Sequence, residues 1–347
     1  MINTLFNEFA LNDTLKLKNK ILMAPMTRCM SGNLGIPGQN VVDYYQRRSD
    51  VGLIISEGSI VDPMGNGYPG APGIYTAEQT NAWKAVTKAV HEKNGLFFMQ
   101  LWHVGRVSHP SYLNGQKPWG PSAVALSGDI PRSGGLRYGE TQEMSVENIE
   151  HTIKAFATGA RNAMDAGCDG VEIHGANGYI IDQFLRAHTN RREDDYGGSF
   201  EKRMRFALEI VDAVIAEIGS DRCGIRLSPG AYFNMTHTPG DEEVFKLLLS
   251  ELETRKLAYV HVGIFDDSME FPYLKGRASA FLRNNYKGTL VGCGSYTPEA
   301  AATAIEEKNF DLIAIGRPLI ANPDFVTKLK NGGELKAYDA AMLADLF

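Results

Sequence analysis

Residues 169–186 read DGVEIHGANGYIIDQFLR, and the order of residue types in this stretch decides the fold. Val171, Glu172 and Ile173 predict a short buried strand. Hydrogen-bonding side chains then follow on a turn that contains two glycines, and apolar residues return at helical spacing from Ile180. A strand that ends in polar side chains and continues into a helix is typical of an α/β enzyme with its site at the carboxyl edge of the sheet.

The same pattern of a strand followed by a helix recurs along the whole chain. Short apolar runs that each precede a helical stretch lie at residues 21–24, 51–56, 96–101, 170–173, 224–227, 259–262, 289–291 and 312–315. Continuous apolar runs are what strands buried on both faces of a parallel sheet require. Eight such units in order predict one (β/α)8 TIM barrel domain over residues 1–347. A doubly wound sheet is the competing interpretation, and the count of eight favours the barrel.

Start signals for helices lie between these runs. Thr76 and Gln79 fit a capping box, in which each side chain satisfies a backbone N–H group of the other. Polar N-cap residues are expected before four further helices, at Ser145, Ser199, Thr297 and Asn322, the last two with proline at the first helical position.

The bulk composition excludes several classes of function. The formal net charge of -6 gives no general attraction to nucleic acid. The four cysteines are scattered and form no Cys-x-x-Cys, so we expect reduced thiols and not a disulfide framework. The first residues do not resemble a signal peptide, and no apolar run approaches the roughly 20 residues that span a bilayer. We therefore expect a cytoplasmic protein.

Three segments lie outside the alternating pattern. Leu15 and Leu17 alternate with lysines after a turn signal, which predicts an N-terminal hairpin that forms a lid. Residues 103–144 are rich in Gly, Pro and Ser, so we expect an excursion over the barrel mouth between the third and fourth strands. A second, smaller excursion is expected over residues 263–273.

Two further motifs are weak. Residues 65–70 match G-x-G-x-x-G, but Pro69 and Pro72 forbid the helix that a dinucleotide fingerprint needs, so we interpret them as a loop over the barrel. His103 and His109 could bind a metal ion in principle, but no third ligand with suitable spacing accompanies them, and no metal is expected.

Glycines after the last two strands predict a phosphate site. Gly294 and Ser295 follow the seventh strand, and Gly316 and Arg317 follow the eighth. Backbone N–H groups that point outward at such turns bind anions, and barrels use these two loops for phosphate. The guanidinium of Arg317 suits phosphate, although tight turns alone would also explain the glycines.

Arg226 interrupts the apolar run 224–227, where a charge is costly unless it is paired. A structural salt bridge would explain it. Next to a phosphate site, the anionic pyrimidine edge of a reduced flavin is the alternative partner, and Gln100 can both donate to and accept from such an edge.

His174, Asn177 and Tyr179 follow the fourth strand. Histidine and asparagine three residues apart can hold one carbonyl oxygen and draw electron density toward it. Tyr179, with an ordinary pKa of about 10, can donate a proton. A satisfied core histidine is the alternative for His174 alone, but three such groups on one turn favour function.

Several motifs together carry a resemblance to a known family. They are ILMAPMTR (21–28), GLIISEG (52–58), GNGYPGAPGIYT (65–76), QLWHVGR (100–106), HGANGYIIDQFL (174–185), DDYGGSFEKRMRF (194–206) and AIGRPLIANPDF (314–325). Over residues 4–330 the chain resembles the old yellow enzymes, FMN-dependent ene-reductases, and within them the N-ethylmaleimide reductase-like branch. The resemblance implies a (β/α)8 barrel that binds FMN without a covalent bond.

The resemblance also implies roles for individual residues. Thr27 would bond the flavin carbonyl near N5, and Gln100 and Arg226 would hold the pyrimidine edge. The flavin ring would be lined by Pro25, Met26 and Gly58, and the phosphate bound by Gly294, Ser295, Gly316 and Arg317. The substrate oxygen would bind His174 and Asn177, Trp102 would form a wall of the pocket, and Tyr179 would donate the proton.

By this resemblance, NAD(P)H reduces FMN, which then delivers hydride to the β-carbon of an activated alkene. Unsaturated carbonyl compounds, nitro compounds and nitrate esters are the implied substrates, for a monomer or homo-oligomer with no nucleic-acid or membrane partner. Two alternatives stay open: another FMN-dependent barrel oxidoreductase, and a flavin-binding protein with incidental turnover. The final residues, KAYDAAMLADLF (336–347), differ from the aromatic, glycine-rich tail usual in the family, so we expect a different active-site rim.

Overall fold

The barrel strands are as the apolar runs predict. The computed structural model describes residues 2–131 and 133–347. In this part of the chain the barrel consists of β3 (Ile21–Met23), β4 (Leu53–Ile55), β6 (Phe97–Trp102), β9 (Gly170–Gly175), β10 (Cys223–Leu227), β11 (Tyr259–Val262), β14 (Leu290–Gly292) and β15 (Leu312–Ile315). Neighbouring strands pair in parallel, and pairing of β15 with β3 and of β4 with β6 closes the ring. The structure therefore confirms the barrel over the doubly wound sheet.

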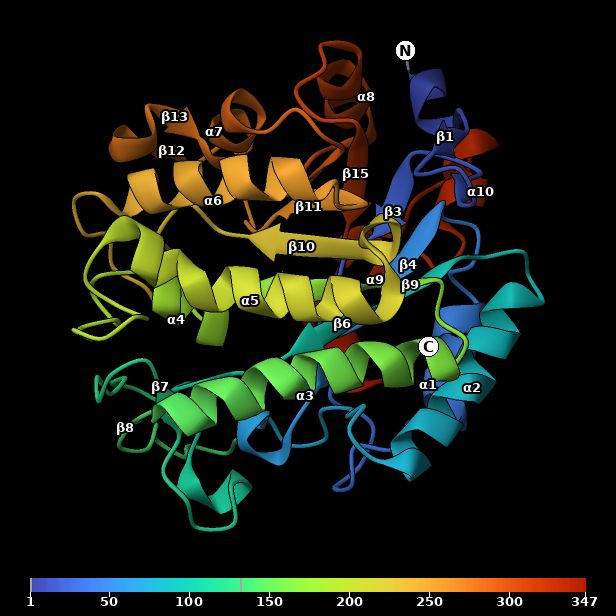
Figure 1. Cartoon of the computed structure of the whole chain (residues 1–347). Coiled ribbons are helices and arrows are strands. Elements are labelled where there is room, and N and C mark those ends of the chain that lie inside the picture. The colour runs from blue at the N-terminus through green and yellow to red at the C-terminus, as the bar shows by residue number, and fades with distance from the viewer. Residues whose placement is uncertain (1, 132) are drawn as a thin grey trace.

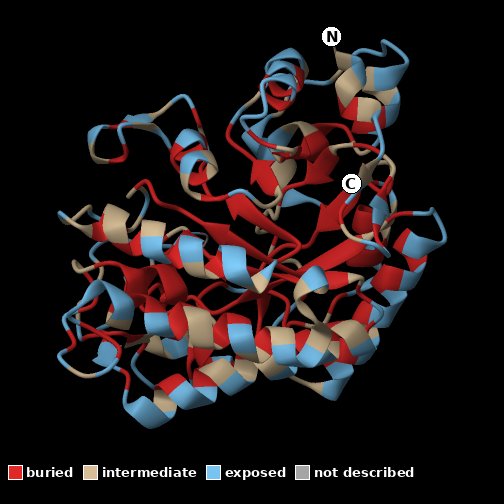
Figure 2. Cartoon of the chain, turned by 45° about the horizontal axis from the view of Figure 1, so that its top comes forward, coloured by how far each residue is buried: buried red, intermediate tan, exposed pale blue. Residues whose placement is uncertain are grey.

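Helices surround the ring of strands (Figure 1). The outer helices are α1 (Gln39–Gln46), α2 (Ala77–His91), α3 (Val146–Asp165), α5 (Phe200–Ile218), α6 (Asp241–Arg255), α7 (Ala278–Asn285), α8 (Pro298–Glu306) and α10 (Phe325–Lys330). Two short helices, α4 (Ile180–Leu185) and α9 (Arg317–Ala321), follow β9 and β15 directly. Figure 2 shows the buried strands enclosed by helices whose outer faces are exposed.

Side chains along each strand alternate between two buried clusters. Leu22, Phe98 and Tyr259 face the barrel interior, where they pack with one another. Their neighbours, such as Ile21 and Met99, belong to the cluster that the strands share with the helices. Alternation with a period of two is inherent to strands, so every second residue of each strand faces the barrel axis.

The predicted helix starts are mostly confirmed. Thr76 forms the capping box with Gln79, and the side chains of Ser145, Ser199 and Thr297 each accept a bond from a backbone N–H in the first turn. The expectation for Asn322 was wrong. It ends α9, and its side-chain amide donates to the carbonyl groups of Pro318 and Lys336, while α10 begins after Asp324.

The N-terminal hairpin closes the end of the barrel opposite the mouth. Strands β1 (Phe9–Ala10) and β2 (Lys16–Leu17) pair antiparallel. Leu17 is fully buried in the interior cluster, beside Leu22 and Phe98. The Asn12 amide donates to the carbonyl of Asp221, just before β10, at 2.7 Å. The predicted lid is therefore confirmed, and it covers the amino ends of the strands.

The connections carry short elements. Strand β5 (Ser59–Ile60) pairs with β6, β7 (Trp119–Gly120) pairs with β8 (Gln142–Glu143) in the long excursion, and β12 (Glu270–Phe271) pairs with β13 (Gly276–Arg277) in the second. The 3-10 helices are Ile2–Phe6, Pro63–Gly65, Pro110–Tyr112, Ser220–Arg222, Pro272–Leu274 and Ala340–Ala344. Across residues 2–131 and 133–347, no helix is long and apolar enough to cross a membrane.

We predict that Leu17→Ala lowers the free energy of unfolding by about 2–5 kcal/mol, because it leaves a cavity in the closed end of the barrel. Urea denaturation followed by circular dichroism measures this change. Lys16→Ala is the matched control, since Lys16 is exposed and pairs with the exposed Glu8. A surface change of this kind alters stability by about 0.5 kcal/mol or less. Equal effects of the two variants would show that the hairpin does not plug the barrel.

Candidate active site

Two adjoining cavities lie at the carboxyl ends of the strands. The larger has a volume of about 410 Å³ and the smaller about 350 Å³, and Pro25, Arg226 and Arg317 line both. Further predicted residues in the larger cavity are Met26, Gly294, Ser295 and Gly316. Those in the smaller cavity are Thr27, Gln100, His174, Asn177 and Tyr179. The structure thus brings together residues as distant in the sequence as Pro25 and Arg317.

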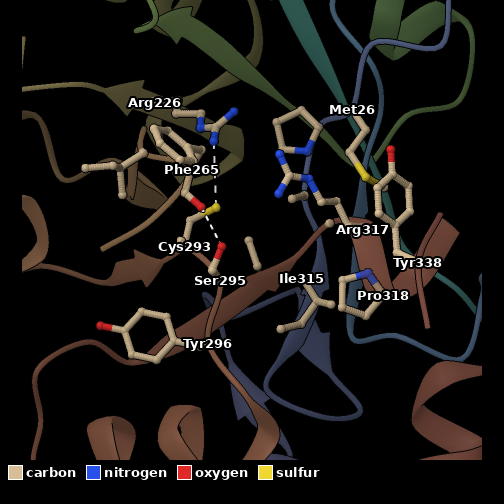
Figure 3. Close-up of a pocket in the computed structure, with 16 residues that line it drawn as sticks. Met26, Arg226, Phe265, Cys293, Ser295, Tyr296, Ile315, Arg317, Pro318 and Tyr338 are labelled. Atoms are coloured by element: carbon tan, nitrogen blue, oxygen red, sulfur yellow. Dashed lines mark hydrogen bonds between the residues drawn. The ribbon is translucent and has the colours of Figure 1, made fainter. Parts of the chain in front are cut away.

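The predicted phosphate-binding residues form one end of the larger cavity (Figure 3). Gly294 has φ +116°, and a Cβ atom there would lie 2.5 Å from the backbone nitrogen of Asp267, so this position requires glycine. Ser295 follows in the left-handed region with φ +61°, and its hydroxyl donates to the carbonyl of Phe265. The guanidinium of Arg317 lies 5.9 Å from the ring of Tyr338.

Arg226 faces the barrel interior from β10, between His174 on β9 and His261 on β11. Its Nη2 lies 3.7 Å from Cys293 Sγ, and its buried Nε atom has no hydrogen-bond partner in the part of the chain described. No carboxylate lies within 4.0 Å of its guanidinium in these residues, because the nearby Glu172 pairs with His261 instead. The structural salt bridge considered for Arg226 is therefore wrong as a direct ion pair.

A hydrogen-bonded network of buried polar side chains lies beneath the cavities. Glu172 accepts from Gln100 Nε2 at 2.7 Å, and its other oxygen lies 2.8 Å from His261 Nδ1. Burial alone would raise the pKa of Glu172, but His261 outweighs this effect and lowers it. Burial alone would lower the pKa of His261, but Glu172 outweighs this effect and raises it. Both shifts favour the charged form of the pair, and Glu172 fixes the side chain of Gln100.

Asp182 holds the turn after β9 in place. Its carboxylate accepts from the backbone of Gly178 at 2.9 Å and pairs with Arg186 at 3.0 Å. Asn177 has φ +61°, and its backbone N–H donates to Ser228 Oγ at 2.9 Å. These bonds direct His174, Asn177 and Tyr179 into the smaller cavity.

The three side chains on this turn carry hydrogen-bonding groups without a formal charge. Burial, with Arg226 nearby, lowers the pKa of His174 well below its usual value, so its imidazole is neutral. Burial also raises the pKa of Tyr179 well above its usual value, so its hydroxyl stays protonated. The Tyr179 and Tyr68 hydroxyl oxygens lie 3.0 Å apart. Asn177 Nδ2 donates to the hydroxyl of Tyr232.

The loop that carries Thr27 is fixed by Glu57, whose carboxylate accepts from the backbone N–H groups of Arg28 and Cys29 at 2.8 and 2.7 Å. Two other predicted residues line neither cavity. Trp102 lies behind the wall, with its ring 5.0 Å from that of Tyr179 and 6.2 Å from that of His174. Gly58 packs on Trp102, because a Cβ atom there would lie 2.6 Å from the indole.

Several residues at the site were not predicted from the sequence. Tyr68, Tyr232, Phe265, Cys293 and Tyr338 each line a cavity or contact a residue that does. Tyr68 lies in the Gly- and Pro-rich loop over the barrel, where an aromatic residue could have been recognised as part of the rim. Cys293 lies between the end of β14 and Gly294, so its place beside the predicted phosphate site could have been read from the sequence. Tyr232, Phe265 and Tyr338 lie in loops whose course depends on the tertiary structure.

Glu172 and His261 were also missed, although a signal was present. Each is an ionisable residue within an apolar strand, which is the reason that Arg226 was singled out. The same argument predicts that all three side chains face a common buried site.

Comparison with known proteins identifies the family. Residues 4–336 match the model of the NADH:flavin oxidoreductase / NADH oxidase family. The chain is 39% identical to "12-oxophytodienoate reductase 7" of Oryza sativa subsp. japonica, over 93% of this chain and 87% of that protein. It is 38% identical to "Probable flavin mononucleotide-dependent alkene reductase" of Leishmania infantum, over 94% of this chain and 90% of that protein.

Solved structures give the same answer. The old yellow enzyme homologue of Zymomonas mobilis superimposes with a TM-score of 0.92 at 34% identity, covering 98% of this chain and 96% of that chain. Morphinone reductase in complex with tetrahydroNAD superimposes with a TM-score of 0.89 at 37% identity, covering 98% of this chain and 93% of that one.

We predict that Glu172→Gln lowers the free energy of unfolding by about 3–5 kcal/mol, because it leaves buried cationic groups without their carboxylate. Chemical denaturation near pH 6 measures the change. The control is Glu140→Gln, which breaks the exposed pair with Lys117 and should have little effect.

The loss should also depend on pH. Because the folded pKa of His261 is raised, its protonation stabilises the fold below about pH 6.5, and this contribution is lost as the pH rises through the folded value. The difference between the wild type and Glu172→Gln should therefore shrink as the pH rises. A difference that does not change with pH would contradict a charged Glu172–His261 pair.

Proposed function

The chain belongs to the NADH:flavin oxidoreductase / NADH oxidase family, and from this premise we propose how its residues hold FMN and reduce an activated alkene. It is an FMN-dependent alkene reductase of the old yellow enzyme type, with a nicotinamide coenzyme as reductant. The specific substrate and the role of each residue are our proposal. The observation that carries the proposal is the convergence of hydrogen-bond donors and one proton donor on the smaller cavity.

The two cavities fit FMN by their chemistry. At one end lie the cation of Arg317 and the turns at Gly294 and Gly316, which suit a phosphate. At the other end Arg226 has a buried Nε atom that needs an acceptor. A phosphate at Arg317 and a pyrimidine edge at Arg226 and Gln100 would satisfy both ends. We propose that Ser295 assists the phosphate and that Pro25, Met26 and Thr27 lie along the flavin ring.

Gly58 and Trp102 have a supporting role in this proposal. Trp102 packs behind His174 and Tyr179, with ring centroids 6.2 and 5.0 Å away. Gly58 leaves the space that the indole occupies. These contacts fix the orientation of the rings that face the substrate.

The substrate oxygen binds to His174 and Asn177. Both can donate. His174 Nδ1 accepts from the backbone N–H of Ala176, so the hydrogen of the neutral ring is on Nε2, and the Asn177 amide has a second N–H besides the one it donates to Tyr232. Two donors on one carbonyl or nitro oxygen stabilise the negative charge that develops on it and leave the β-carbon electron-poor. FMN, when bound and reduced by NAD(P)H, supplies hydride to that carbon.

Tyr179 supplies the proton to the α-carbon. Its raised pKa keeps the hydroxyl protonated near neutral pH. The Tyr68 hydroxyl, 3.0 Å away, can return a proton to Tyr179. Because Phe233 and Phe265 are exposed and also line the smaller cavity, the rim favours substrates with an apolar body.

The test of this function is anaerobic reduction of 2-cyclohexenone by NADPH. We expect the purified chain to be yellow with bound FMN and to catalyse this reaction. Tyr179→Phe should slow the step in which the alkene is reduced by about 10²–10⁴-fold, because the general acid is lost. Stopped-flow absorbance separates this step from reduction by NADPH, which should be unchanged.

Tyr68→Phe is the matched control for Tyr179→Phe, since it removes a buried hydroxyl from the same pair but leaves the donor in place. We expect a much smaller effect. Alkene reduction that is unaffected by Tyr179→Phe would contradict the assigned proton donor. A colourless chain without flavin absorbance, or one that binds FMN but does not reduce the enone, would overturn the function itself.

A second prediction tests the oxygen-binding pair. Titration of the FMN-loaded chain with p-hydroxybenzaldehyde should produce a long-wavelength charge-transfer band, because His174 and Asn177 would hold a phenolate over the flavin. Loss of one donor to a charged acceptor costs about 1.5–3 kcal/mol, so His174→Ala and Asn177→Ala should each weaken binding by roughly 10–100-fold. Binding that neither variant weakens would place the oxygen site elsewhere.

A further inference from the structure

Four ionisable side chains meet on the inner side of the barrel, each from a different strand or strand end. They are Glu172 on β9, Arg226 on β10, His261 on β11 and Cys293 directly after β14. Arg226 and His261 are paired in register on neighbouring strands, and Arg226 Nη2 lies 3.7 Å from Cys293 Sγ. Arg226 is assigned to FMN binding in the proposed function, whereas Cys293 has no role in it.

The charges of this cluster do not balance without the thiol. Arg226 is permanently cationic, and His261 is paired with Glu172 at 2.8 Å. Two cations therefore share one carboxylate in a buried environment, where an uncompensated charge is costly. A thiolate at Cys293 would make the cluster neutral. Figure 3 shows the sulfur directed toward Arg226.

The environment of Cys293 supports ionisation. Burial alone would raise the pKa of the thiol, but His261 and the charge of Arg226 outweigh it and lower the pKa. Glu172 acts in the opposite direction, and the hydroxyl of Tyr232, from the loop after β10, also interacts with the cysteine. By contrast, burial raises the pKa of Cys168 and of Cys223, which have no cationic neighbour of this kind.

Cys293 can also be reached from the larger cavity. It lines this cavity together with Arg226, Gly294 and Arg317, whereas Cys168 and Cys223 pack between the strands and the outer helices. A thiolate that faces a cavity is the form of cysteine that reacts with electrophiles.

We propose that Cys293 is a modification site for electron-poor alkenes, open when the larger cavity is empty and shielded when FMN fills it. The shielding rests on the proposed function, because it requires FMN to occupy this cavity. The ligand class is the same as that of the substrates, so an activated alkene is reduced by the loaded chain and captured by the flavin-free chain.

The reaction is a conjugate addition that needs no oxidant or reductant. The Sγ atom forms a bond to the β-carbon, the π bond of the alkene breaks, and its electron pair moves to the α-carbon and the attached carbonyl. Water then protonates the α-carbon. The thioether then occupies the cavity, so the modified chain cannot take up FMN.

The test is alkylation of the full chain by N-ethylmaleimide, mapped by peptide mass spectrometry. In the flavin-free chain we expect Cys293 to react and Cys168 and Cys223 not to react. The pH dependence of the rate should follow a thiol whose pKa is lower than the ordinary value for cysteine. Because half-buried Cys29 is also open to the reagent, the label is followed on the peptide that contains residue 293. On this peptide His261→Gln should shift the dependence to higher pH, Cys293→Ser should lose the label, and the matched Cys168→Ser should keep it.

Titration of the flavin-free chain with FMN provides a second measurement. The rate at Cys293 should fall as free FMN rises, by about 100-fold at 100 times the dissociation constant of FMN. A chain alkylated at Cys293 should no longer become yellow.

If the loaded chain is yellow and active but Cys293 reacts at the same rate with and without FMN, the proposal is overturned and the function stands. If Cys293 does not react in a flavin-free chain whose circular dichroism is native, the proposal is also overturned. A chain that never binds FMN would instead overturn the proposed function.

Discussion

The structure depends on one geometric constraint, the alternation of side chains along strands that form a closed ring. Every second residue must face the axis, and the axis of a barrel has no solvent. Toward the amino ends of the strands these positions are apolar, as in Leu22 and Phe98. Toward the carboxyl ends they are polar, as in Gln100, His174 and Arg226. The change from apolar to polar along the same inner positions creates the floor of the site.

Polar groups at these inner positions have to be satisfied by each other or by a ligand. Glu172 accepts from Gln100 and pairs with His261 Nδ1 within hydrogen-bond distance. Arg226 is only partly satisfied, with a sulfur atom at 3.7 Å and an Nε atom without a partner. Arg226 faces both cavities, so the buried network supports the fold and leaves a donor for a cofactor.

The sequence was sufficient for features that depend on local patterns. Apolar runs located every barrel strand, and the capping residues at Thr76, Ser145, Ser199 and Thr297 started helices as predicted. Asn322 failed because its amide is used by carbonyl groups that include Lys336, a contact with no local signature. Tyr232 and Tyr338 were missed for the same reason, since the paths of their loops are set by packing. Trp102 and Gly58 were predicted as residues of the site, but nothing in the sequence indicated that they contact each other, because this contact depends on the tertiary structure.

The closure of the ring has a consequence for synthesis of the protein on the ribosome. Strand β3 pairs with β15, so that Ile21 lies beside Ile313. The first barrel strand therefore leaves the ribosome long before its neighbour exists, and one of its edges stays unpaired until nearly the whole chain has been made. Contacts this distant in sequence form slowly, and exposed strand edges promote aggregation. The nascent chain should thus depend on protection by chaperones until its last βα units emerge.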